Sequence, residues 1–463
     1  MELLKALQME SIDQILKAQV DGESPALHNA CYLVVSNDGI VYSKAHGSAD
    51  LARTKPISLD SLHWIASLTK LSTAVATLIA VDQGLVTLDD DVRKIVPELA
   101  ELDVLEGFDD DGKPRLRPCT APISLRQLLS HSSGFCYDQH HEGLKRWASY
   151  VGKKETTFTG SMEGYRYPLV FEPGQGWAYG SGMDWAGRTI EVVAKQDLES
   201  FMKKHIWTPL RMGSTTFRPW TRPDLEASLV ELAWRNPDGT LIKGKNPFGP
   251  AVDCCGGVGL FSTPNDQIKL LSSLLRGDGG ILSREGIEEL LRPQTEDSSH
   301  FLSVVCGTKR AHLGQTWPQG SQGDFGLSSS INTTDFPGRR AANSANWQGM
   351  PGVHAWLDRA TGLAGVFTTQ LLPPGDKVVT DTFCALEEAV YKASGSYASL
   401  AFGLSASKPW GLGALGLWVF VSANATVNQP PEERDIDNNF GSRPKTSTSI
   451  GIKITLARAD LAA

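Results

Sequence analysis

Apolar positions recur at helical spacing directly after residue 67. Between residues 67 and 84 the pattern predicts a helix that begins at or near residue 67 and is capped by Gly84. Its apolar residues, spaced three and four apart, are Leu71, Ala74, Val75, Leu78 and Ile79.

The N-terminal part of the chain reads as a helix followed by a hairpin. Residues 1–20 mix apolar and charged positions, which is typical of an amphipathic helix. Two short apolar runs, residues 31–36 and 40–46, flank the turn residues Asn37-Asp38-Gly39. This arrangement predicts two antiparallel strands.

The middle of the chain is predicted to be mainly helical, with β-like runs returning later. We expect long loops around a short helix at 124–129 between residues 98 and 180, because this stretch is rich in Gly, Pro, Asp and aromatic residues. Helical patterns opened by a capping residue or a proline occupy residues 184–194, 198–210, 264–276 and 283–291. Short β-like runs follow between about 322 and 370, and a closing helix covers 377–392.

The composition changes after residue 394, which sets the expected domain boundary. We expect residues 1–394 to form one catalytic domain, with an α/β part at about 1–66 and 322–394 and a mainly helical lobe at about 67–321. Residues 395–463 have no periodicity that ties residues 430–450 to a core, so we expect a partly disordered appendage.

Composition and charge narrow the class of protein. The chain has 463 residues, 41% of them hydrophobic and 21% charged, as in a soluble globular protein. A net charge of -8 leaves no basic surface for phosphates, so we expect no nucleic-acid partner. The seven cysteines follow no disulfide or metal-binding spacing, which favours a reducing, cytoplasmic location. The apolar run at 410–423 is shorter than a bilayer requires and the N-terminus lacks a signal-peptide core, so we expect no membrane contact.

The candidate nucleophile is Ser67, three residues before Lys70. At a helix start this spacing places both side chains on one face, where an uncharged lysine can take the proton of the serine hydroxyl. The helix N-terminus adds free N–H groups that can hold an oxyanion. The bare pattern also occurs at 200–203, 405–408 and 442–445, but only Ser67 lies at a predicted helix start. The alternative for Ser67 is a plain helix cap beside a solvated Lys70.

A second candidate is Tyr179, which lies in a turn-rich loop at residues 172–181. Its phenol, polarised by a nearby ammonium, could relay the proton between Ser67 and the leaving group. The alternative is an aromatic side chain packed between Trp177 and Trp185.

Several other features are interpreted as structural. His140, His141 and Glu142 lack a metal-binding His-Glu-x-x-His pattern, so we expect surface-loop histidines. Residues 89–91 are expected to be solvated carboxylates that open the segment 92–95, and His131 to fix a loop through its ring nitrogens. The glycines at 256–259 do not form a phosphate-binding loop and are expected to allow close packing beneath the pocket. We predict no metal and no cofactor.

In four stretches the chain resembles the serine β-lactamase-like family, which includes class C β-lactamases, family VIII esterases and fungal lovastatin-type transesterases. The resemblance covers about residues 10–393 and rests on residues 64–70, 128–134, 173–179 and 256–263. It implies the α+β β-lactamase/transpeptidase-like fold, in which an antiparallel sheet flanked by helices adjoins a helical lobe. It also strengthens the assignment of Ser67, Lys70 and Tyr179 as catalytic residues.

Departures from the family pattern bear on the substrate. Ser181 stands where lactamases and peptidases usually carry an asparagine, and Trp347-Gln348-Gly349 replaces their Lys/His-Thr-Gly motif. Without that cation a substrate carboxylate would be desolvated with little compensation, which favours neutral esters or thioesters. Trp347 and Gly349 are therefore expected at the substrate, with the N–H of Met350 as the second oxyanion donor.

The resulting hypothesis is an acyltransferase that moves an acyl group through Ser67 from an ester or thioester to an alcohol of a small secondary metabolite. The donor would be a small molecule, either free or bound to a carrier protein. Alternatives are a carboxylesterase for small neutral esters, a β-lactamase or D-alanyl-D-alanine peptidase, and a catalytically silent binding protein.

Overall fold

A computed structural model shows a main compact unit that covers Met1–Tyr391 and a second unit at Lys392–Ala463. The structure describes residues 2–402, 410–411, 417–423 and 452–458, with side-chain surroundings for residues 9–394. Most of the predicted appendage, including residues 430–450, lies outside the described residues. In the second unit β15 (Trp410–Gly411), β16 (Leu417–Ala423) and β17 (Ile452–Arg458) pair antiparallel.

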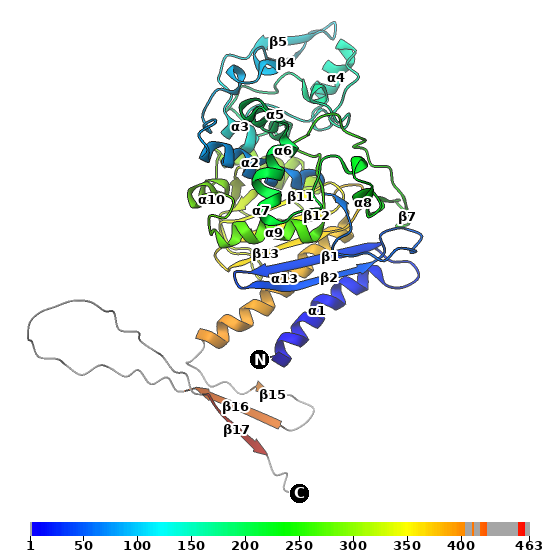
Figure 1. Cartoon of the computed structure of the whole chain (residues 1–463), viewed down its shortest axis with the longest axis vertical. Helices are drawn as coiled ribbons and strands as arrows, with labels where there is room; N and C mark the ends of the chain where they lie inside the picture. The colour runs from blue at the N-terminus through cyan, green and yellow to red at the C-terminus, as the bar shows by residue number, and fades with distance from the viewer. Residues whose placement is uncertain (1, 403–409, 412–416, 424–451, 459–463) are drawn as a thin grey trace, which may run out of the picture. The chain divides into compact units, whose positions relative to one another are not determined.

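The main unit contains a seven-stranded antiparallel sheet, which lies below the helical lobe in Figure 1. The spatial order is β2-β1-β13-β12-β11-β10-β9, so the N-terminal hairpin pairs with strands from far along the chain. Val34 on β1 lies opposite Gly365 on β13, for example. The strands are β1 (Asn29–Ser36), β2 (Gly39–Gly47), β9 (Gly323–Phe325), β10 (Ser330–Asn332), β11 (Ser344–Gly349), β12 (Val353–Asp358) and β13 (Leu363–Thr368).

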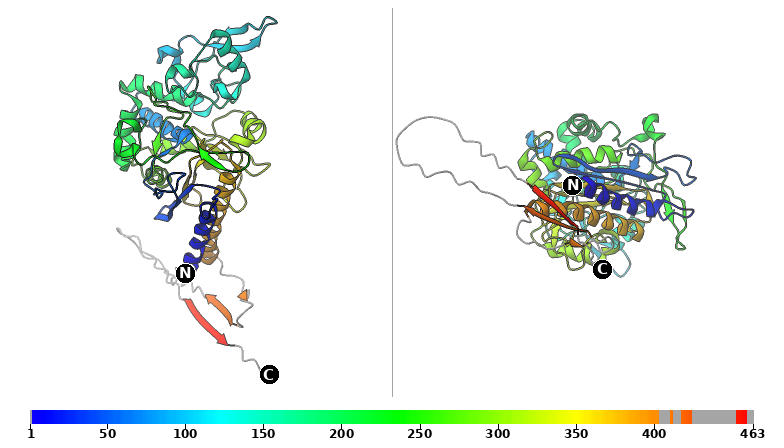
Figure 2. Two further views of the ribbon diagram at one scale, coloured as in Figure 1. Left: turned by 90° about the vertical axis from the view of Figure 1, so that its right-hand side faces the viewer. Right: turned by 90° about the horizontal axis from the view of Figure 1, so that it is seen from below.

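Helices cover both faces of this sheet, which explains why β1 reads as an unbroken apolar run. On one face α1 and α13 lie side by side in Figures 1 and 2 and bury a cluster that contains Leu16, Phe367 and Phe383. On the other face α9 packs against β1 and β13. This helix falls within the range expected for the helical lobe, yet it belongs to the sheet layer.

The helical lobe is built around α2, which packs against α5, α6 and α10. Eleven of the fourteen residues of α2 are buried, so this helix is enclosed on almost every side. The helices are α1 (Glu2–Val20), α2 (Thr69–Asp82), α3 (Leu125–Ser130), α4 (Glu142–Val151), α5 (Gly182–Ala194), α6 (Leu198–Met202), α7 (Thr208–Leu210), α8 (Pro223–Glu226), α9 (Pro264–Arg276), α10 (Arg284–Leu291), α11 (Ser298–Leu302), α12 (Arg310–Leu313) and α13 (Lys377–Phe402).

Residues 98–180 contain more regular structure than the predicted loops. They include α4 and an antiparallel hairpin of β4 (Asp103–Phe108) and β5 (Pro114–Pro118). The expectation of surface-loop histidines at 140–142 is wrong in this respect, because His141 caps α4 by accepting a hydrogen bond from the N–H of Leu144. The remaining short strands are β3 (His63–Trp64), β6 (Ala233–Arg235), β7 (Leu241–Lys243), β8 (Phe261–Ser262) and β14 (Leu371–Leu372).

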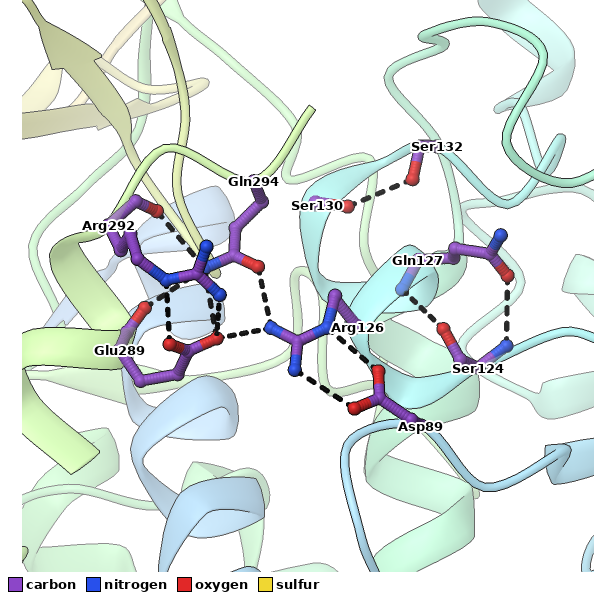
Figure 3. Close-up of polar contacts among 9 residues, drawn as sticks. All are labelled: Asp89, Ser124, Arg126, Gln127, Ser130, Ser132, Glu289, Arg292 and Gln294. Atoms are coloured by element: carbon purple, nitrogen blue, oxygen red, sulfur yellow. Dashed lines mark hydrogen bonds and ion pairs between the residues drawn. The ribbon is translucent and has the colours of Figure 1, made fainter. Parts of the chain in front are cut away.

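A polar cluster ties α3 to its neighbours, as Figure 3 shows. Arg126 on α3 forms ion pairs with Asp89, which follows α2, and with Glu289 on α10. Asp91 accepts a hydrogen bond from the N–H of Arg93 and so caps the turn that it was expected to open. Ser124 begins α3 with a reciprocal capping box. Of the carboxylates expected to be solvated, Asp89 is 72% exposed but ion-paired with Arg126, whereas Asp91 is largely buried beside Arg93.

Candidate active site

Ser67 lies in a strained turn between a short strand and the helix that carries Lys70. The strand β3 pairs with β8, and a 3-10 turn at Ala66–Leu68 leads directly into α2. Ala66 has a φ of 44°, in the left-handed region that residues with a Cβ rarely adopt. Such a conformation persists only when the surroundings fix it, and it presents the side chain of Ser67 to a cavity.

Lys70 is completely buried one turn further on. Its Nζ lies 3.2 Å from the Oγ of Ser67 and 3.2 Å from the hydroxyl of Tyr137. It also donates a 2.7 Å hydrogen bond to the carbonyl of Gly257. The spacing of Ser67 and Lys70 therefore brings the two side chains together as expected.

Asp184 and Tyr137 extend this network behind the lysine. The hydroxyl of Tyr137 donates to Asp184 over 3.2 Å, and the N–H of Gly257 donates to the other carboxylate oxygen over 2.8 Å. Burial raises the pKa of Asp184 to about 6, while the positive charge of Lys70 opposes that shift. Asp184 is therefore a carboxylate at neutral pH.

Gly257 is the point where the backbone meets these polar groups. A Cβ at this position would lie 2.5 Å from a carboxylate oxygen of Asp184 and 2.6 Å from the hydroxyl of Tyr137. Only glycine lets the main chain offer its N–H and its carbonyl to the network at once. The expectation of close packing by the glycines at 256–259 is confirmed.

Tyr179 hydrogen-bonds Ser67 and packs against Lys70 and Tyr137 of this buried network. Its hydroxyl donates a 2.6 Å hydrogen bond to the Oγ of Ser67. The indole N–H of Trp347 lies 3.4 Å from the same phenolic oxygen, and Nζ of Lys70 lies 4.7 Å from the centre of the Tyr179 ring. The Oγ of Ser67 thus has a phenol and an amine within hydrogen-bonding distance.

His131 fixes the loop that carries Tyr179, although only one of the two ring nitrogens expected to do so has a hydrogen-bond partner among the described residues. The N–H of Gly180 donates to its Nδ1 over 3.4 Å, and its carbonyl accepts from the N–H of Ala178. Burial, with a further contribution from Lys70, lowers the pKa of His131 well below its ordinary value. The imidazole is therefore neutral and holds the loop by packing against Tyr179 and by hydrogen bonding.

A cavity of about 280 Å³ opens in front of Ser67. Gly349 and Met350 line it, as the expectation of a substrate contact requires. Trp347 does not line this cavity; it is buried behind Tyr179. A Cβ on Gly349 would overlap the carbonyl of Ile65, so glycine is needed here because β11 runs tightly against the Ser67 turn.

Other residues of the site could not be anticipated from local patterns. Tyr137 and Asp184 lie 67 and 47 residues apart in sequence from the groups that they hydrogen-bond, and Asp184 carries the signal of a helix-capping residue. His140 lines the cavity, contrary to the surface position expected for it. Lys309 supplies a cation to the wall, although Trp347 stands in the place of the cation of the family motif.

Comparisons with known proteins agree with this geometry. A sequence profile of the β-lactamase family matches residues 12–388. The chain is 35% identical to lovastatin esterase from Penicillium rubens over 73% of this chain and 86% of that protein. It is 32% identical to monacolin J acid methylbutanoyltransferase from Aspergillus terreus over 76% and 88% of the two chains.

Solved structures give the same answer for the fold. A mutant of simvastatin synthase from Aspergillus terreus superposes with a TM-score of 0.78 at 30% identity, covering 83% of this chain and 95% of that one. The α+β β-lactamase-like fold and the resemblance expected from the sequence are confirmed. The chain belongs to the β-lactamase family and is an enzyme related to the acyltransferases and esterases of that family.

Proposed function

We propose that this enzyme transfers an acyl group through an ester on Ser67, from a thioester or ester donor to an alcohol of a small metabolite. One observation carries the proposal: the Oγ of Ser67 lies 2.6 Å from the hydroxyl of Tyr179 and 3.2 Å from Nζ of Lys70, at the wall of a cavity. A hydroxyl held between a base and a phenol is arranged for acyl transfer.

In the first half-reaction Ser67 attacks the donor carbonyl and its proton passes to the neutral amine of Lys70. The bond from the acyl carbon to the leaving sulfur or oxygen breaks, and Tyr179 gives its proton to that leaving group. The proton held by Lys70 then replaces the one lost by Tyr179. The products are an ester on Ser67 and a free thiol or alcohol, with both proton carriers restored.

In the second half-reaction an alcohol attacks the Ser67 ester along the reverse route. Its proton passes to the pair of Tyr179 and Lys70, the bond from the acyl carbon to Oγ breaks, and Ser67 recovers a proton. We assign the N–H groups of Ser67 and Met350 to the developing oxyanion. Met350 follows β11 directly, and among the described residues its N–H has no backbone acceptor.

The names of the relatives support this choice of reaction. Monacolin J acid methylbutanoyltransferase is named for the transfer of a methylbutanoyl group and for an acid, and Lys309 gives this cavity a charge suited to an acidic acceptor. A donor carried on a carrier protein is part of the proposal. Hydrolysis of an ester is the second candidate, because another relative is named lovastatin esterase.

Incubation with the butanoyl thioester of N-acetylcysteamine, with and without monacolin J acid, tests the proposal. Intact mass should show one butanoyl group on the wild-type chain and none on the Ser67→Ala variant. The products should contain more butanoyl ester than butanoic acid when the alcohol is present. Butanoic acid as the sole product would support the esterase, and an absent adduct would reject both candidates.

A further inference from the structure

His140 has a position that the reaction above does not use. It ends a 3-10 turn at Asp138–His140 and lines the cavity together with Ser67. Its ring centre lies 6.0 Å from that of Tyr179 and 6.4 Å from that of Tyr137. The imidazole therefore lies beside the phenol that handles the proton.

Asp138 and His141, which flank His140 and Gln139, have structural hydrogen bonds, whereas the ring of His140 has none within residues 9–394. Asp138 accepts hydrogen bonds from the hydroxyl and the N–H of Thr157, and His141 caps α4. Within residues 9–394, no protein group hydrogen-bonds the ring nitrogens of His140. The turn is thus fixed on both sides and presents one unused imidazole to the cavity.

The surroundings of His140 also determine its charge and include a second polar group without a hydrogen-bond partner. Burial, reinforced by Lys309 and His312, lowers the pKa of His140 to about 4, so the ring is neutral at physiological pH. A neutral imidazole has one N–H donor and one acceptor nitrogen, which matches a hydroxyl group. Adjacent Gln139 also lines the cavity, and its buried amide oxygen has no hydrogen-bond partner among the described residues.

We propose that His140 binds a hydroxyl group of the acyl acceptor and so forms, with Gln139, the acceptor subsite of the cavity. The inference rests on the proposed function and names the part of the site that selects an alcohol over water. His140 takes no proton in the reaction: the acceptor's proton passes to Tyr179 and Lys70, and Ser67 leaves the acyl carbon as before. A hydrogen bond from His140 raises the occupancy of the alcohol near the ester, which increases transfer relative to hydrolysis.

The test compares His140→Phe with His141→Asn in the full chain. Phenylalanine keeps a ring against Tyr137 and Tyr179 but removes both hydrogen-bonding nitrogens, while asparagine can still cap α4. Each protein is acylated with S-phenyl butanethioate, whose leaving group has no hydroxyl, in the presence of cyclohexanol. The burst of thiophenol counts the folded, reactive Ser67, and the ratio of cyclohexyl butanoate to butanoic acid measures acceptor binding.

We expect His140→Phe to lower the ester-to-acid ratio by about three- to tenfold, the usual effect of one neutral hydrogen bond, and His141→Asn to leave it unchanged. An unchanged ratio in His140→Phe would overturn the inference, as would an equal fall in both variants. Ligand-observed NMR on Ser67→Ala and on the double variant Ser67→Ala/His140→Phe gives the cyclohexanol Kd without catalysis. If the wild-type enzyme makes only butanoic acid, the transferase proposal fails, and the Kd comparison alone supports His140 as a binding residue or rejects it.

Discussion

Lys70 can act as a base only if the lone pair of its amine faces Ser67. Its hydrogen bonds with Gly257 and Tyr137 determine where that lone pair points. A neutral amine has two N–H bonds and one lone pair. The carbonyl of Gly257 takes one N–H, since it can only accept. When Asp184 is ionised, Tyr137 donates to it and the phenolic oxygen takes the second N–H. The lone pair that remains is directed at the hydroxyl of Ser67.

Protonation of Asp184 should reverse the direction of this hydrogen-bond chain. A protonated carboxyl donates to Tyr137, whose own proton then turns to the lone pair of Lys70 and blocks it. Burial raises the pKa of Asp184 to about 6 beside a charged Lys70, so below that pH the resting site must lose a further proton before Lys70 can act with an ionised Asp184. We expect the rate of Ser67 acylation to rise with pH through about 6, as stopped-flow release of thiophenol from S-phenyl butanethioate would measure.

The variant Asp184→Asn should mimic the protonated state at every pH. Its amide oxygen still accepts from the N–H of Gly257, so its NH₂ group must donate to Tyr137. We expect the acylation rate at pH 8 to fall by about 100-fold, which is the usual effect of losing a general base. The rise of the rate near pH 6 should also disappear. Tyr137→Phe should lower the acylation rate less than Asp184→Asn does, because no phenolic proton then competes for the lone pair of Lys70. A pH 6 limb that survives in Asp184→Asn would contradict this assignment.

The tyrosines and the cysteine near Asp184 do not account for a change in the acylation rate near pH 6. Lys70, Tyr137, Tyr165 and Cys255 face its carboxylate. Burial raises the pKa of Tyr137, Tyr165 and Cys255 well above their ordinary values, so none of these three ionises near pH 6. The cavity histidine His140 has a pKa lowered to about 4. A limb near pH 6 that depends on residue 184 therefore reports the buried carboxylate.

The same residues explain how much of the site sequence could predict. Ser67 and Lys70 are three positions apart on one helix, so local geometry alone brings them together. Tyr179 was identified from its loop and the family resemblance. Tyr137 and Asp184 meet Lys70 only through the packing of α5 and two loops around α2, and no spacing along the chain encodes that contact. Asp184 was instead interpreted as a helix cap, which is the usual role of an aspartate at that position.

At the scale of elements, the C-terminal end of β11 positions Ser67 against the sheet. Gly349 ends β11 where the strand passes the carbonyl of Ile65, just before the Ser67 turn. We expect Gly349→Ala to push β11 and this turn apart and to lower the acylation rate by about 100-fold, because a shift of one ångström in a reacting group costs that much. Gly213→Ala is the matched control, since a Cβ there meets nothing within 4 Å at a glycine without positive φ.

Both glycine variants are tested by the thiophenol burst and by urea unfolding. Overpacking at Gly349 should also lower the free energy of unfolding by about 1–3 kcal/mol, whereas Gly213→Ala should leave both quantities near those of the wild type. Normal acylation by Gly349→Ala would show that the close approach of β11 does not position Ser67.

The Arg126 cluster joins three elements and should be worth more than a single surface pair. Arg126 is 26% exposed and meets Asp89, Glu289 and Gln294 from separate segments (Figure 3). We expect Arg126→Met to lower the free energy of unfolding by about 1 kcal/mol at low salt and by less in 1 M NaCl, where ion pairs are screened. Urea unfolding measures both values.

Arg222→Met is the control for this prediction, because Arg222 and Asp224 form one exposed pair two residues apart. Its loss should leave the unfolding midpoint unchanged. An equally large effect of both variants would mean that the cluster adds nothing beyond one surface pair.

The predictability of the elements follows from their periodicity. The helices at 264–276 and 284–291 and the hairpin of β1 and β2 were predicted closely, since each has a clear apolar repeat and capping or turn residues. The hairpin of β4 and β5 was missed because its second strand is largely polar and charged. The helix α4 was missed although its residues are strongly amphipathic, because its start is the pair of histidines that was interpreted as a loop.

At the scale of the whole molecule, every group of the proposed site lies between residues 63 and 380. The sheet and the helical lobe share one apolar core that runs from Leu33 to Val366. Beyond the sheet, α1 and α13 complete the second core with Ile12 and Val390 at its ends. The described chain therefore closes its two largest cores before residue 394, and the second of them needs both α1 and α13.

This arrangement predicts that a chain ending at Ser394 keeps its activity, while loss of α1 does not. We expect the truncated protein to show a thiophenol burst within about twofold of the full chain, because it retains both cores and the whole network around Lys70. The double substitution Ile12→Asp/Leu16→Asp should abolish soluble expression, since it places two charges in a buried apolar cluster against Phe383 and Tyr32. Loss of the burst on truncation, with the protein still folded by circular dichroism, would assign residues 395–463 a part in the reaction.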